Sequence, residues 1–205
     1  TVEFCGHIFV SDKRALVPRP ETEELVELLL SALGSQKSDV SIADVGTGSG
    51  VIALSLAAKL PAARITAIDI SDDALALARE NAEKLGLSER VRFNQGDLFQ
   101  NITERFDLIV ANLPYVSSRA RSSLSREVLH DPAVALFGGE EGDEMIRQLV
   151  NEAPPRLATG GLLALEIGMG QMPALAEALA QKNYHDIESK TDYAGTPRFL
   201  LARYG

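Results

Sequence analysis

Apolar residues recur along this 205-residue chain in two patterns, continuous runs of about five positions and positions spaced three or four residues apart. Short continuous runs are typical of buried strands, whereas the wider spacing is typical of helices with one buried face. The runs, together with shorter segments between predicted helices and turns, give predicted strands at 41–45, 64–70, 91–95, 106–111, 162–167, 186–190 and 198–203. The wider spacing predicts helices at 22–33, 50–60, 72–85, 142–157 and 174–181.

This alternation predicts an α/β protein with a doubly wound, mostly parallel sheet and helices on both faces. The last two strands are too close in sequence for a crossover helix, so we expect them to pair antiparallel. Residues 1–38 are expected to form a short hairpin, with its turn at 11–13, and a helix that lead into the main domain at 39–205. The polar, turn-rich stretch 116–139 is predicted to be a mobile substrate loop.

The charge balance narrows the range of partners. The net charge is −9, and proteins that grip nucleic acid usually present a basic face to the phosphates. The basic residues that gather here, Arg119, Arg121 and Arg126, are interspersed with serines, so direct binding of DNA or RNA is not expected. No apolar run approaches the roughly 20 residues that span a bilayer. The single cysteine, Cys5, suits a reducing cytoplasm and is expected to pack as a small apolar residue.

A glycine-rich segment follows the strand at 41–45, at the edge where ligands bind in sheets of this kind. It consists of Gly46, Thr47, Gly48, Ser49 and Gly50. Glycines let the backbone approach a ligand closely, and amides at the start of the next helix can bind a carboxylate. A dinucleotide fingerprint would have glycine or alanine where this chain has Val51. This spacing, and the lack of a candidate hydride-transfer residue, disfavours an NAD-dependent dehydrogenase.

Acidic residues follow the next two strands. Asp69, about twenty residues beyond the glycine segment, can accept hydrogen bonds from both ribose hydroxyls of a nucleoside. Asp97 is placed to meet an adenine amino group, with Leu98 or Phe99 against the ring. Either acid alone could simply cap a helix or a turn. Three such features at successive strand ends predict a site for a nucleoside-bearing cofactor.

The strand at 106–111 is followed by Asn112-Leu113-Pro114-Tyr115, a tetrapeptide suited to a planar nitrogen substrate. Because the lone pair of an amide nitrogen is delocalised, its methylation needs acceptors that hold both N–H bonds and orient the nitrogen. The side-chain oxygen of Asn112 can be one acceptor, and a backbone carbonyl of the following residues the other. Tyr115 can cover the flat face of the amide, and Pro114 biases Leu113 to an extended conformation. An ordinary turn after a strand is the alternative interpretation.

The two motifs together predict methyl transfer from S-adenosylmethionine to an amide or amino nitrogen. The tetrapeptide resembles the Asn-Pro-Pro-Tyr motif of enzymes that methylate such nitrogens. Leu16-Val17-Pro18-Arg19-Pro20-Glu21-Thr22-Glu23 resembles the N-terminal signature of the HemK/PrmC family, the release factor glutamine methyltransferases. A further match is Leu165-Glu166-Ile167-Gly168, and the resemblance covers essentially the whole chain.

The resemblance implies a seven-stranded, Rossmann-like class I methyltransferase domain that methylates the glutamine of a Gly-Gly-Gln loop in peptide-chain release factors. By position, it assigns cofactor binding to the glycine segment, Asp69 and Leu98. It assigns Asn112 to both cofactor and glutamine, and the substrate site to Leu113, Pro114 and Tyr115. Of these, Asn112, Pro114 and Tyr115 are the expected catalytic residues, and Pro20, Glu21 and Thr22 are expected to border the pocket. The family also has an N-terminal helical domain that helps to dock the release factor; this chain is expected to represent the catalytic domain.

One departure from the family keeps other substrates open. Leu113 stands where the family has a proline, although leucine can still supply a backbone carbonyl. Because Asn-Leu-Pro-Tyr also occurs in adenine dimethylases of ribosomal RNA, the alternatives are an adenine amino group in RNA or DNA and the glutamine of another protein. A catalytically silent cofactor-binding module is a third hypothesis, which the otherwise intact motifs oppose.

Several polar residues have no clear place in this scheme. His7, His130 and His185 show no metal-ligand spacing, so no metal site is expected. Glu166 could face the cofactor region or make a structural hydrogen bond. Arg198 is expected to pair with an acidic residue at the edge of the sheet.

Overall fold

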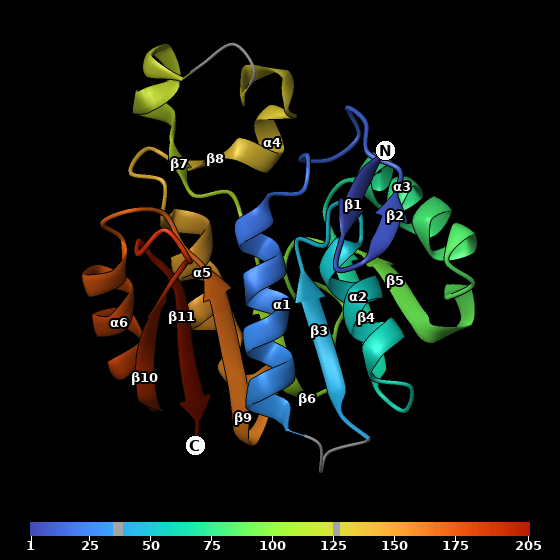
Figure 1. The fold of residues 1–205 in the computed structure, drawn as a ribbon. Helices are drawn as coiled ribbons and strands as arrows, with labels where there is room; N and C mark the ends of the chain where they lie inside the picture. The colour runs from blue at the N-terminus through green and yellow to red at the C-terminus, as the bar shows by residue number, and fades with distance from the viewer. Residues whose placement is uncertain (35–38, 125–127) are drawn as a thin grey trace.

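The computed structural model describes residues 1–34, 39–124 and 128–205, so Arg126 and the stretch 35–38 lie outside the described residues. Its main feature is a seven-stranded sheet in the order β10-β11-β9-β6-β3-β4-β5 (Figure 1). The first five strands of the sheet in chain order are parallel, and β11 is antiparallel to both of its neighbours, so the predicted topology is confirmed. The strands are β3 (Ser41–Val45), β4 (Arg64–Asp69), β5 (Val91–Gln95), β6 (Phe106–Ala111), β9 (Leu157–Glu166), β10 (Tyr184–Thr191) and β11 (Pro197–Tyr204).

Helices cover both faces of the sheet, because alternate residues of the central strands point to opposite faces. In β6, for example, Leu108 belongs to one core cluster and Ile109 to the other. The first cluster includes residues of α1, α2 and α3, and the second includes residues of α5 and α6. These helices are α1 (Pro20–Leu33), α2 (Val51–Lys59), α3 (Asp72–Lys84), α5 (Glu144–Glu152) and α6 (Met172–Ala180).

The N-terminal hairpin lies earlier in the chain than predicted. Strand β1 (Val2–Phe4) pairs antiparallel with β2 (His7–Phe9) around Cys5 and Gly6, which both have positive φ. Positive φ at both central residues is required by the tight turn that matches strand twist, and glycine adopts it readily. The rings of the two strands' phenylalanines meet edge to face and are buried, which anchors the hairpin in the core. The predicted turn at 11–13 is therefore wrong, whereas Cys5 packs against the core as expected.

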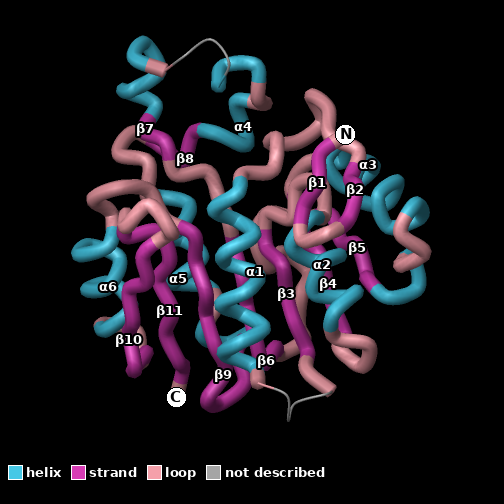
Figure 2. Tube along the Cα trace, viewed as in Figure 1, coloured by secondary structure: helices cyan, strands magenta, loops and turns pink. Residues whose placement is uncertain are grey.

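The residues between β2 and α1 have no regular strand or helix (Figure 2). Helix α1 begins at Pro20, two residues earlier than predicted, because proline is well suited to the first turn, where a missing N–H breaks no bond. At the other side of the fold, α5 ends before Pro154, and β9 begins at Leu157. The predicted helix 142–157 is therefore too long, since proline in a helix interior removes a hydrogen bond.

The described residues of the stretch 116–139, namely 116–124 and 128–139, lie over the carboxyl ends of the strands, at the top of Figure 1. As expected of a loop region, its regular elements are short. They are β7 (Val116–Ser117), 3-10 helices at Ser118–Ser123 and Val128–His130, α4 (Ala133–Leu136) and β8 (Phe137–Gly139). Elsewhere the structure has 3-10 helices at Ser88–Arg90 and Pro154–Arg156. Within the described ranges, no helix combines the length and the apolar character needed to cross a bilayer.

Candidate functional site

Residues at the carboxyl ends of four parallel strands line one cavity. It is lined by Gly46 after β3, Asp69 at the end of β4, Asp97 after β5 and Asn112 after β6. Its volume is about 690 Å³ including its open mouth. The strand order reverses between β3 and β6, which is where sheets of this type form a ligand-binding crevice. The arrangement brings the two sequence motifs to one site.

The glycine segment is held in shape by the strand beside it and by a buried acid beneath it. The backbone N–H groups of Gly46 and Thr47 both donate to the carbonyl of Ile68, at 2.8 and 2.9 Å. The Asp44 carboxylate accepts from the Thr47 hydroxyl at 2.6 Å and from the Ala53 amide at 3.1 Å. Burial raises the pKa of Asp44 to about 7. Asp44 thus ties the segment to the start of α2.

The five glycine-segment residues divide into two groups. Gly46 and Gly48 line the cavity, both with positive φ. The other three do not line it, and each contacts the rest of the fold. The Thr47 hydroxyl donates a hydrogen bond to Asp44, and the Ser49 carbonyl accepts one from Asn81 of α3. A Cβ on Gly50 would lie 3.1 Å from the Cβ of an alanine in α3. Their predicted cofactor role would thus be indirect, through the shape of the segment.

Asp69 is held by two backbone amides. One carboxylate oxygen accepts from Gly48 at 2.8 Å, and the other accepts from Ser71 at 2.9 Å. Burial raises the pKa of Asp69, and these amides oppose that rise. Because a carboxylate has about four acceptor positions, lone pairs remain for hydroxyl donors in the cavity. Asp69 therefore has the chemistry that a ribose diol requires.

The sequence predicted that either Leu98 or Phe99 contacts the adenine ring. Leu98 lines the cavity next to Asp97, whereas Phe99 does not line it. Both side chains are 5% exposed and belong to the core cluster that includes α5. Two further apolar side chains at the cavity, Ile70 and Val134, are 49% and 55% exposed. Exposed apolar side chains at a mouth are suited to a flat ring.

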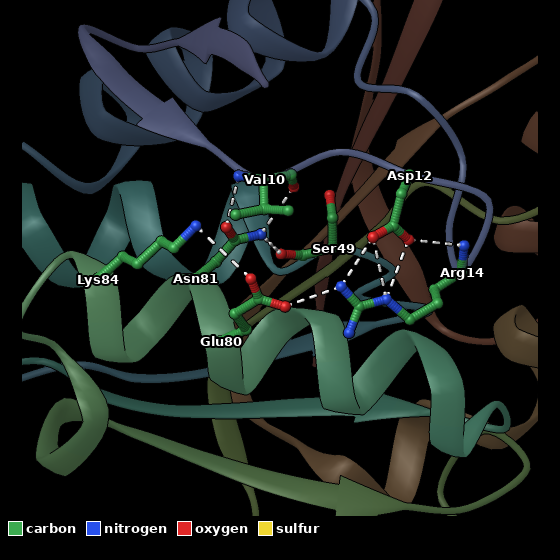
Figure 3. Close-up of polar contacts among 7 residues, drawn as sticks. All are labelled: Val10, Asp12, Arg14, Ser49, Glu80, Asn81 and Lys84. Carbon is green, nitrogen blue, oxygen red and sulfur yellow. Dashed lines mark hydrogen bonds and ion pairs between the residues drawn. The ribbon is translucent and has the colours of Figure 1, made fainter.

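One wall of the cavity, formed by residues 14–16, was missed by the sequence interpretation. Arg14, Ala15 and Leu16 line the cavity, although the sequence pattern placed them in a strand. Figure 3 shows how the segment is attached to α3: the buried Asn81 side chain accepts from the Val10 N–H at 2.7 Å and donates to the Val10 carbonyl at 3.1 Å. Its amide also donates to the glycine segment at Ser49, at 2.9 Å.

Arg14 makes a second attachment to α3. Its guanidinium pairs with Asp12 and with Glu80, each at 2.7 Å (Figure 3). Further lining residues are Pro132 and Ala135, from the stretch between β7 and α5, and Met145 in the first turn of α5. No local sequence signal indicates these residues, because their place depends on how distant segments pack.

Replacing Asn81 by alanine should lower the free energy of unfolding by about 2 kcal/mol, because the change removes three hydrogen bonds from a buried side chain. It should also speed amide hydrogen exchange in residues 10–17, which lose their anchor. Chemical denaturation and hydrogen exchange measure the two effects. Glu83→Ala, at an exposed position of the same helix, is the matched control. Unchanged exchange in residues 10–17 would refute the anchoring role of Asn81.

The Asn112 side chain begins a chain of hydrogen bonds that leads away from the cavity. Its Nδ2 donates to the Thr22 hydroxyl at 3.1 Å, and that hydroxyl donates to Glu166 at 2.8 Å. The Tyr115 hydroxyl donates to the other oxygen of Glu166 at 3.3 Å. Glu166 is 1% exposed, and it makes structural hydrogen bonds rather than lining the cavity. Burial raises the pKa of Glu166 to about 7 and that of Tyr115 to about 12.

The remaining residues of the tetrapeptide differ in their exposure to the cavity. Leu113 and Pro114 line it, whereas Tyr115 does not. Leu113 is also buried, and its side chain would lie 2.7 Å from a Cβ placed on Gly46. The glycine segment and the tetrapeptide are therefore packed together at this point. Pro20, Glu21 and Thr22, expected to border the pocket, do not line it, although Thr22 reaches Asn112.

Arg198 pairs with the buried Asp192 at 3.4 Å and donates to the carbonyl of Ile167, so the expected pairing at the sheet edge is confirmed. Among the described residues, no three His, Cys, Asp or Glu side chains group as metal ligands would. The cavity residues are thus the candidates for binding and chemistry.

Comparison with known proteins agrees with this geometry. The profile of the Methyltransferase small domain family matches residues 21–141. A release factor glutamine methyltransferase from Deinococcus radiodurans is 44% identical over 202 residues, which make up 98% of this chain and 71% of that protein. One from Moorella thermoacetica is 45% identical over 202 residues, with the same shares. A crystal structure of a release factor-specific protein-(glutamine-N5) methyltransferase from Alicyclobacillus acidocaldarius is 26% identical, with a TM-score of 0.57 over 96% of this chain and 99% of that one.

Proposed function

The chain belongs to the release factor glutamine methyltransferase family, and we propose that its cavity holds S-adenosylmethionine beside the glutamine of a Gly-Gly-Gln loop. The enzyme is an S-adenosylmethionine-dependent protein-(glutamine-N5) methyltransferase, and its substrate is a peptide-chain release factor. The observation that best supports the proposed site is the position of Asn112, which lines the cavity while its Nδ2 donates a hydrogen bond to Thr22.

The cavity residues fit the methyl donor. Asp69 has lone pairs for the ribose hydroxyls, and Gly46 and Gly48 let the backbone approach the ligand. Asp97 and Leu98 would hold the adenine. When bound, S-adenosylmethionine supplies an electrophilic methyl group on a sulfonium sulfur.

The side chains around the second motif orient the glutamine. Asn112 Oδ1 would accept one N–H of the substrate amide, and the carbonyl of Leu113 would accept the other. With both N–H bonds held, the nitrogen presents its remaining face to the methyl group, and orientation replaces a strong base. The reaction forms an N–C bond, leaves the C–S electron pair on sulfur and releases one amide proton. Tyr115, tied to Glu166, would cover the flat face of the amide.

Two further inferences concern partners and location. We infer that the chain does not bind nucleic acid directly, because the two described residues of its basic cluster are already engaged: Arg119 pairs with Glu140 and Glu141, and the Arg121 guanidinium lies 5.3 Å from the ring centre of Phe137. The net charge of −9 supports the same inference. A role in translation termination and the single cysteine support a cytoplasmic location.

Radiolabelled methyl transfer from S-adenosylmethionine to a purified release factor tests the function. We expect label on the intact factor and none on a variant whose Gly-Gly-Gln glutamine is replaced by alanine, with structured RNA as a parallel substrate. Label on RNA alone would assign the adenine reaction instead. Label on both forms of the release factor would assign the methylation to a different residue of the factor.

A further inference from the structure

The hydrogen-bond chain behind Asn112 joins three parts of the fold that are far apart in sequence. Thr22 comes from α1, Asn112 and Tyr115 follow β6, and Glu166 ends β9. Of these four residues only Asn112 lines the cavity, so Thr22 and Glu166 can act on a ligand there only through Asn112. Thr22 and Glu166 are 3% and 1% exposed, which shields their bonds from water.

The directions of these bonds determine which atom Asn112 presents to a substrate. A threonine hydroxyl has one hydrogen, and Thr22 donates it to Glu166. The Thr22 oxygen can then only accept, so the Asn112 amide must turn its NH₂ group toward it. The amide oxygen is left on the opposite side, with no donor among the residues that the structure describes. An oxygen in that position is the acceptor that an N–H of a substrate amide needs.

We propose that Thr22 and Glu166 are positioning residues that fix the orientation of the Asn112 amide and thereby keep its oxygen available to the glutamine. This inference rests on the proposed function. Neither residue needs to touch the substrate, because each acts through the direction of one hydrogen bond.

The same hydrogen-bond chain makes the orientation of the Asn112 side-chain amide depend on the charge of Glu166. The groups that face this carboxyl are Thr22 and Glu21 from α1, Tyr115 after β6 and Arg198 from β11. A protonated Glu166 could donate to Thr22, which would free the threonine hydrogen to bond the Asn112 oxygen and reverse the amide. The ionised form is therefore the productive one.

The titration of Glu166 falls near neutral pH. Burial raises its pKa from the ordinary range to about 7, and the hydrogen bonds from Thr22 and Tyr115 oppose that rise. Since the fraction of ionised carboxylate falls as the pH drops below the pKa, kcat should decline below about pH 7.

Two threonine variants separate the hydroxyl from the shape of the side chain. Thr22→Val removes the hydroxyl and nearly keeps the volume, so kcat for the release factor should fall about 10- to 100-fold through misorientation of Asn112. Thr22→Ser keeps the hydroxyl and should stay within about threefold of wild type. The affinity for S-adenosylmethionine should change less than about twofold in both. Equal kcat values for the two variants would overturn the proposal.

Glu166→Gln tests the titration. The variant cannot ionise at this position, so the decline of kcat below about pH 7 should disappear, whatever its maximal rate. A decline that persists in Glu166→Gln would overturn the proposed dependence on this carboxyl.

A substrate-free measurement distinguishes failure of this inference from failure of the proposed function. The side-chain NH₂ resonances of Asn112, assigned by their loss in Asn112→Ala, should shift with a midpoint near the Glu166 pKa of about 7. They should not titrate in Glu166→Gln or in Thr22→Val. If the wild-type enzyme left release factors unlabelled but showed this titration, the proposed function would be refuted and the proposed hydrogen-bond chain from Glu166 through Thr22 to Asn112 would stand. If the Asn112 resonances did not titrate in the wild type, the proposed control of the Asn112 orientation by Glu166 would be refuted.

Discussion

Replacing Asn112 by alanine is expected to lower kcat for methyl transfer on the order of 10³-fold, close to abolition, because one of two acceptors that orient the glutamine amide is lost. The affinity for S-adenosylmethionine should stay within several-fold, since Asp69 and the glycine segment are untouched. Single-turnover transfer of labelled methyl to a release factor measures the first quantity, and calorimetric titration with the cofactor measures the second.

Asn151→Ala provides the matched control for this change. Asn151 is an exposed residue of α5 and is not a lining residue of the cavity, so its replacement should leave both kcat and cofactor affinity unchanged. If Asn112→Ala retained turnover comparable to this control, the acceptor role of Asn112 would be refuted. A parallel loss of cofactor affinity would instead assign Asn112 chiefly to the cofactor.

Replacing Asp69 by alanine should act first on the cofactor. Two hydrogen bonds from ribose hydroxyls to a carboxylate would be lost, at about 1.5 to 3 kcal/mol each, so the affinity for S-adenosylmethionine should fall on the order of 10²- to 10⁴-fold. The backbone amides of Gly48 and Ser71 would also lose their acceptor, which loosens the glycine segment. Calorimetric titration at one pH and ionic strength measures the change.

Two further variants make the Asp69 result specific. Asp69→Asn keeps one acceptor oxygen and the side-chain shape, so it should bind the cofactor with an affinity between those of the wild type and the alanine variant. Asp73→Ala removes an exposed acid from the first turn of the neighbouring helix α3 and should leave affinity unchanged. Unchanged affinity in Asp69→Ala would remove this residue from the ribose site.

Leu113 illustrates how a departure from the family motif is accommodated. The side chain is buried over Gly46, and a Cβ on the glycine would lie 2.7 Å from its Cδ2, so the leucine would have to shift. Leucine at this position therefore packs the tetrapeptide onto the glycine segment, and its backbone carbonyl is still present for the substrate amide. Because the contact needs a residue without a side chain on the other side, the two motifs constrain each other.

The sequence by itself determined the elements of the sheet and the edge at which the site lies. The strands at 41–45, 91–95 and 106–111 have the bounds that were predicted. For the central strands β3 and β6 the reason is that a buried parallel strand is mostly apolar in sequence. Parallel strands share their carboxyl edge, so motifs that directly follow strands must lie near one another. The short distance along the chain between strand and motif is why local patterns sufficed.

Only the tertiary structure decided which residues complete and support the site. Val10 is bound by a side chain 71 positions away, Asn112 by one 90 positions away, and Thr22 by one 144 positions away. Local propensity carries no information about such pairs, since they exist only after the helices have packed on the sheet. The wall at 14–16 and the hydrogen-bond chain behind Asn112 are thus properties of the packed fold, in which distant polar groups must find partners once water is excluded.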